Sequence, residues 1–87
     1  LLSFELQDEL LSKELLMDKI ILTKEILNTN QKIYENLSTT AFGQNDVLLS
    51  LLNNLMQTVE TEIKLNALHY QYQESLAKIN YLLGVEL

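Results

Sequence analysis

The fold is decided by residues 38–46, Ser-Thr-Thr-Ala-Phe-Gly-Gln-Asn-Asp, which lie at the middle of the 87-residue chain between two long helical patterns. The hydroxyl residues weaken the helix before this stretch, Gly43 can adopt the left-handed conformation that ends a helix, and Asn45 or Asp46 can cap the next one. We therefore expect an all-α fold, a single antiparallel two-helix coiled-coil hairpin. Its helices should cover about residues 2–41 and 46–83, with the tip at about 42–45.

The composition is typical of long helices rather than of a sheet. Apolar residues make up 47% of the chain, leucine supplies most of them, and proline, cysteine and tryptophan are absent. Two helices can bury only one face against each other, so we expect partners to cover the remaining apolar surface. Because the chain starts at Leu1 and both ends stop with little punctuation, we also expect it to be a fragment of a larger chain.

The net charge of −6, from twelve acidic residues and six lysines with no arginine, argues against two classes of partner. A nucleic-acid surface needs clustered basic residues, and a helix that binds an anionic membrane surface needs a basic polar face. No apolar run exceeds three residues, so we expect neither a transmembrane helix nor membrane contact by this segment.

Apolar residues recur every eleven positions in both halves of the chain. In the first half they form one row, in which two sets interleave: Phe4, Leu15, Ile26 and Leu37, with Leu11, Leu22 and Ile33. A second row follows a roughly seven-residue spacing: Leu6, Leu10, Met17, Ile20, Leu27 and Tyr34. Since an eleven-residue repeat gives about 3.67 residues per turn, helices that follow it should be nearly straight. Residues 28–31, Asn-Thr-Asn-Gln, are the weakest helix formers in this half, and we expect the helix to continue through them.

The second half repeats the pattern and adds polar rows. Its eleven-residue sets are Leu48, Val59, Tyr70 and Tyr81, then Leu52 with Ile63, Leu65 with Leu76, and Leu68 with Ile79. One polar row contains Asn53, Gln57, Glu60, Lys64, Gln71, Glu74 and Lys78, and another contains Asn54, Thr58, Glu62, His69 and Gln73. Gly84 follows Leu83 and has the position of a glycine that ends a helix.

The residues give no case for an enzyme, a metal site or a cofactor. His69 is the single histidine, and it has no cysteine or second histidine with which to complete a zinc site. The carboxylates lack a calcium-binding loop, the serines lack triad partners, and no nucleotide-binding glycine pattern is present. A solvated helix face is the simpler interpretation of the acids, although a ring of them around a pore would select cations.

The second half resembles the hairpins of the outer membrane efflux protein family, the TolC-like channels. The matching residues are Phe42-Gly43-Gln44-Asn45 at the tip, followed by Asp46-Val47-Leu48, and then Tyr72-Gln73-Glu74-Ser75-Leu76 and Asn80-Tyr81-Leu82-Leu83-Gly84 along the helix. The resemblance covers roughly residues 34–84, and the first helix matches only in pattern.

Similarity to that family implies a trimer of the full-length chain in the outer membrane of Gram-negative bacteria. This segment would be a hairpin of its periplasmic helical tunnel. The resemblance implies that the tip residues Phe42, Gly43, Gln44, Asn45 and Asp46 contact a periplasmic adaptor of a tripartite pump. Polar residues such as Glu60, Glu62 and His69 would face the lumen.

Two other functions fit the pattern of long helices. An adaptor hairpin from the same pumps is one, but adaptors usually carry an arginine near the tip and this chain has none. A general coiled-coil interaction module or scaffold is the other, because the helical patterns alone equally allow it.

Overall fold

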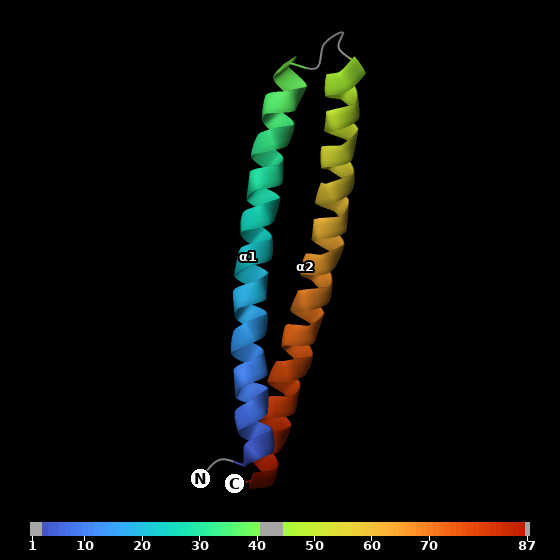
Figure 1. Cartoon of the computed structure of the whole chain (residues 1–87). Coiled ribbons are helices and arrows are strands. Elements are labelled where there is room, and N and C mark those ends of the chain that lie inside the picture. The colour runs from blue at the N-terminus through green and yellow to red at the C-terminus, as the bar shows by residue number, and fades with distance from the viewer. Residues whose placement is uncertain (1–2, 41–44, 87) are drawn as a thin grey trace.

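A computed structural model describes residues 3–40 and 45–86 of the chain. They form two helices, α1 (Phe4–Thr40) and α2 (Asn45–Glu86), and the described residues contain no strand. The helices run antiparallel over a molecule that measures 66 × 15 × 14 Å (Figure 1). The predicted all-α two-helix hairpin is therefore confirmed. Of the predicted tip, residues 42–44 lie outside the described residues.

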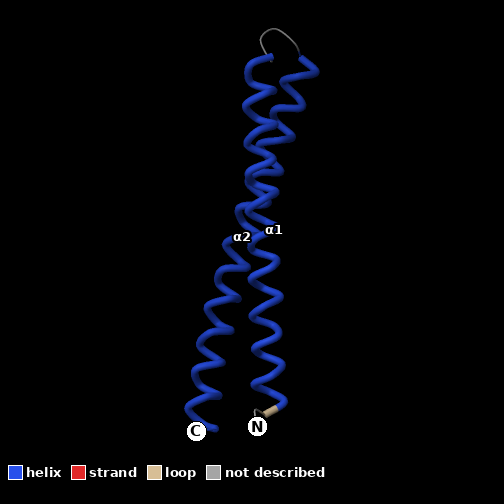
Figure 2. The backbone as a smooth tube through the Cα atoms, turned by 90° about the vertical axis from the view of Figure 1, so that its left-hand side faces the viewer, coloured by secondary structure: helices blue, strands red, loops and turns tan. Residues whose placement is uncertain are grey.

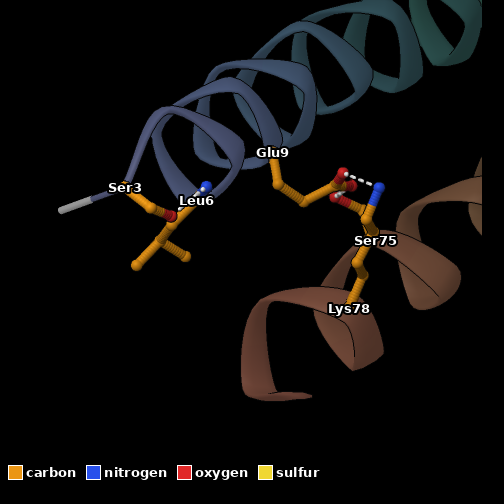
Figure 3. Close-up of polar contacts among 5 residues, drawn as sticks. All are labelled: Ser3, Leu6, Glu9, Ser75 and Lys78. Atoms are coloured by element: carbon orange, nitrogen blue, oxygen red, sulfur yellow. Dashed lines mark hydrogen bonds and ion pairs between the residues drawn. The ribbon is translucent and has the colours of Figure 1, made fainter. Parts of the chain in front are cut away.

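Ser3, which was not among the residues predicted to cap a helix, fixes the start of α1. The Ser3 Oγ accepts a hydrogen bond from the backbone N–H of Leu6 at 3.1 Å (Figure 3). The Ser3 carbonyl accepts one from the backbone N–H of Gln7 at 3.0 Å. A serine at this position satisfies an N–H group that has no partner inside the helix. Ser3 is thus the N-cap of α1.

The start of α2 lies slightly earlier than predicted. Because the helix already includes Asn45, both Asn45 and Asp46 belong to its first turn rather than preceding it. The carboxylate of Asp46 then lies near the positive end of the helix dipole, where a negative charge is favourable.

The predicted end of the second helix at Gly84 is wrong, because α2 continues through this residue to Glu86. Glycine permits the left-handed conformation but does not require it. Leu82, just before Gly84, belongs to the apolar cluster with Leu6 at the base of the hairpin, and Leu83 packs against that cluster, so α2 is packed on α1 up to this point.

The continuous first helix is confirmed, since α1 runs unbroken through the weak helix formers at residues 28–31. Asn30, in the middle of this stretch, is buried against α2, and its carbonyl accepts a hydrogen bond from Asn54. Contact with α2 therefore supports the helix where its own propensity is lowest.

The two helices meet along what we call the inner seam, a set of buried and half-buried positions that repeats every seven residues. In α1 these positions are Leu6, Glu9, Lys13, Leu16, Ile20, Thr23, Leu27, Asn30 and Leu37. In α2 they are Val47, Leu51, Asn54, Thr58, Thr61, Leu65, Leu68, Tyr72, Ser75, Ile79 and Leu82. The helices accordingly wind about each other between tip and base, as the two views at right angles show (Figures 1 and 2). A seven-residue seam favours such supercoiling, so the eleven-residue repeat does not describe this contact.

Candidate interaction surface

The inner seam is strongly apolar only at its base. There Leu6, which is 1% exposed, packs with Ile79 and Leu82, and Leu10 and Leu83 lie half-buried beside them. The buried positions of the seam also include four polar side chains, of which Ser75 lies near the base and Thr23, Asn30 and Asn54 lie farther along. The hairpin is therefore closed by a mixture of apolar packing and hydrogen bonds.

Most of the seam hydroxyl groups bond within their own helix. Thr23 Oγ1 donates to the carbonyl of Lys19 at 2.6 Å, and Thr58 Oγ1 donates to the carbonyl of Asn54 at 2.9 Å. Because each hydroxyl donates to a carbonyl one turn earlier, burying it costs little. These groups fill the seam without tying one helix to the other.

Asn54 does tie the helices together. Its Nδ2 donates to the backbone carbonyl of Asn30 at 3.1 Å across the seam, and the Asn54 side chain is only 5% exposed. Its Oδ1 is buried and has no hydrogen-bond partner among the described residues. A buried amide with one group bonded and the other unsatisfied opposes stability while favouring one register of the helix pair.

A second polar cross-link joins the helices near the base (Figure 3). Ser75 Oγ donates to Glu9 Oε1 at 2.7 Å, and Lys78 Nζ lies 3.3 Å from Glu9 Oε2. The side chain of Glu9 is 17% exposed and that of Lys78 is 52% exposed, so solvent screens the ion pair on the lysine side. The buried hydroxyl of Ser75 is the better-protected partner of this carboxylate.

The eleven-residue sets are divided by the fold: Leu37, Leu65, Leu68 and Ile79 lie in the inner seam, whereas most of the other members are exposed. In α1, which starts at the base of the hairpin, the exposed members are Phe4, Leu11, Leu15, Leu22, Ile26 and Ile33. We call them the α1 outer row. In α2 the α2 outer row comprises Leu48, Leu52, Val59, Ile63, Tyr70 and Tyr81, all exposed. Each helix thus carries a second apolar row that the hairpin does not bury, and such contiguous apolar surface marks an interaction site.

The predicted contact residues at the tip and in the lumen divide into three groups. Phe42, Gly43 and Gln44 lie outside the described residues, as does the side chain of Asn45, while Asp46 is exposed at the start of α2. Glu60, Glu62 and His69 are exposed along α2.

One polar row of α2 is divided between the inner seam and the exposed surface. The row that begins with Asn54 and Thr58 does not face outward over its whole length, because Asn54 is buried and Thr58 is half-buried in the inner seam. Near the tip, the positions of this row coincide with those of the inner seam. Only Glu62, His69 and Gln73 of that row are exposed.

The described residues contain no group of three histidine, cysteine, aspartate or glutamate side chains placed to hold a metal ion. Neither α1 nor α2, as far as they are described, has a stretch long and apolar enough to cross a membrane. In comparisons with known proteins, no family model, no curated protein and no solved structure matches the chain.

Proposed function

We propose that the chain is a tunnel hairpin of a trimeric outer membrane efflux or secretion channel, which docks a periplasmic adaptor at its tip. The observation that carries this proposal is the pair of exposed outer rows, one on each helix, beside an inner seam that already holds the hairpin together. A helix in the wall of a tube needs apolar contacts on two sides, one for its hairpin partner and one for the neighbouring hairpin.

The eleven-residue period of the outer rows supports the same proposal. Rows on this period run almost parallel to the helix axis, and they suit neighbours that lie side by side along a long wall. The exposed Glu60, Glu62 and His69 of α2 are available to a water-filled lumen. In this proposal the tip, with Asp46 at its edge, is the end that meets the adaptor.

The test is adaptor capture by the hairpin in four forms: wild type, Gly43→Leu, Asp46→Lys and Asp8→Lys. Asp8 is exposed near the opposite end of the molecule, so its replacement makes the same change of charge away from the tip. The proposal expects capture by wild type and by the Asp8 variant, and loss of capture by both tip variants.

Two results would contradict the proposal. Capture that is unaffected by the tip variants would remove the tip from the contact. Failure of wild-type hairpin to bind any periplasmic adaptor, while it still assembles through its outer rows, would favour a general coiled-coil interaction module.

A further inference from the structure

The tip-proximal part of α2 carries the densest exposed apolar patch among the described residues. Six of its residues fall on one face of the helix and form what we call the α2 patch: Leu48, Leu52, Leu55, Met56, Val59 and Ile63. Every one of these side chains is at least 43% exposed, and Leu49, just outside this face, is 61% exposed. Three of its residues, Leu55, Met56 and Val59, line a surface hollow of about 330 Å³ together with Glu60. An apolar patch with a hollow at its centre is suited to receive side chains from a partner helix.

We propose that the α2 patch binds a second copy of this chain, with the two α2 helices antiparallel about a two-fold axis at Leu55 and Met56. The spacing of the patch supports this partner, because its members are separated by four, three, one, three and four residues and the pattern therefore reads the same in both directions. In an antiparallel pair, Leu48 meets Ile63 of the second copy, Leu52 meets its Val59, and Leu55 meets its Met56. Such self-complementarity is what a two-fold interface requires.

The charge distribution also favours self-association at this patch. The chain carries a net charge of −6, but residues 47–59 contain no charged side chain. Two copies can therefore meet here without placing acids opposite acids. The α1 outer row is the competing surface: its six residues are separated by seven, four, seven, four and seven positions, so it also reads the same in both directions, and an antiparallel pair would place Asp18 beside Lys19 of the second copy. The α2 patch differs in gathering its six residues within positions 48–63 and in having a hollow lined by three of them.

The hairpin exposes more surface than a compact protein of its mass. Its exposed area is 6733 Å², whereas a compact monomer of its 10.0 kDa exposes about 5,200 Å². The excess of about 1,500 Å² is spread over the whole elongated hairpin, and the α2 patch is one part of it; an interface of standard size buries roughly 800 Å² on each partner. This inference does not rest on the proposed channel function, since it concerns the chain when no neighbouring hairpin covers α2.

The test is the mass of the chain in solution, measured by analytical ultracentrifugation over a range of concentrations, for wild type, Met56→Glu, Met56→Lys and Leu22→Glu. Leu22 lies near the centre of the α1 outer row and is 58% exposed, closely matching the 55% exposure of Met56, so it is a matched control. Circular dichroism of each variant checks that its helices are retained.

We expect wild type and Leu22→Glu to sediment at twice the monomer mass. Either charge at Met56 alone should weaken the dimer about 100-fold or more, because the substitution occurs twice at the centre of one interface. Mixing the glutamate and lysine variants should restore a dimer that contains one copy of each, since position 56 lies beside its own counterpart at the two-fold axis.

Three results would overturn the inference: a wild-type monomer at all concentrations, a dimer dispersed by Leu22→Glu but not by Met56→Glu, or no recovery on mixing the helical Met56 variants. None of these results bears on adaptor capture by the tip. The channel proposal and the dimer can therefore fail separately.

Discussion

Replacing Asn54 by leucine should stabilise the hairpin, although it removes a hydrogen bond between the helices. Asn54 is buried in the inner seam, where its Nδ2 bonds to the carbonyl of Asn30 and its Oδ1 has no partner among the described residues. Leucine has a similar size, and it removes both the bond and the unsatisfied acceptor. The sign of the change depends on which of these two losses is larger.

The balance can be estimated from the contacts. Losing a neutral hydrogen bond costs about 1 kcal/mol, whereas removing an unsatisfied buried acceptor returns about 1–3 kcal/mol. The Asn30 carbonyl remains within the α1 hydrogen-bond ladder after the change, so it is not left without a partner. Replacing the amide with methyl groups adds roughly 1 kcal/mol of apolar burial. The free energy of unfolding should therefore rise by about 2 kcal/mol.

Urea unfolding followed by circular dichroism measures this change. A denaturant slope of about 1 kcal/mol per molar urea, as expected for a small protein, converts it to a midpoint about 2 M higher. Asn53→Leu is the matched control, because Asn53 is the adjacent residue of the same type and is exposed. Its replacement should change the free energy of unfolding by less than about 0.5 kcal/mol.

A lower urea midpoint for Asn54→Leu, with Asn53→Leu unchanged, would refute this reasoning. It would mean that the bond to Asn30 contributes more than the unsatisfied oxygen costs. Measuring both variants at the same low concentration, at which each is monomeric by sedimentation, keeps self-association from contributing to the midpoint.

Four further substitutions test the start of α1, the basal cross-link and the end of α2 by urea unfolding. Ser3→Ala should lower the free energy of unfolding by about 1 kcal/mol through loss of the α1 cap, with Ser3→Asp as a control that keeps it; equal midpoints for both would contradict the cap. Ser75→Ala should lower the free energy of unfolding by about 1–2 kcal/mol, because it removes the buried donor to Glu9. Lys78→Ala should lower it by less than about 0.5 kcal/mol, because the lysine side chain is half exposed. The reverse order would show that the ion pair contributes more than the serine hydrogen bond. Gly84→Ala should stabilise by up to about 1 kcal/mol, because Gly84 lies within α2 and a methyl group there meets no atom within 4 Å, and a lower midpoint would contradict its helical conformation.

The hairpin could be predicted from the sequence, because the signals that specify it are local and strong. Helical periodicity, the lack of proline and the single turn signal around Gly43 together define two long helices, and the structure has them as α1 and α2. The helix ends were harder to predict. Ser3 acts through one side-chain bond to Leu6, and Gly84 lies inside α2 because glycine permits the conformation that ends a helix without imposing it.

The inner seam could be predicted only in part, because it is not the most apolar side of either helix. Leu6, Ile20 and Leu27 belong to the predicted seven-residue row and do lie in the seam. Its polar members, such as Asn54 and Ser75, do not belong to the apolar periodicity from which the buried face was predicted. Only the three-dimensional pairing of the helices shows that they are buried.

This distribution of apolar residues has a consequence for how the chain folds. Burial of apolar surface alone would favour pairing of the two outer rows, whereas the structure places the more polar rows together in the seam. This arrangement still holds one register, because the hydroxyls of Thr23 and Thr58 are hydrogen-bonded within their own helices and Asn54 bonds across the seam. It leaves the outer rows for neighbours to cover. Closing the hairpin along this mixed seam leaves many apolar side chains exposed on both helices. In a hairpin that folds this way, a partner that covered the outer rows would complete the burial that the single chain leaves unfinished, and would raise its stability at the same time.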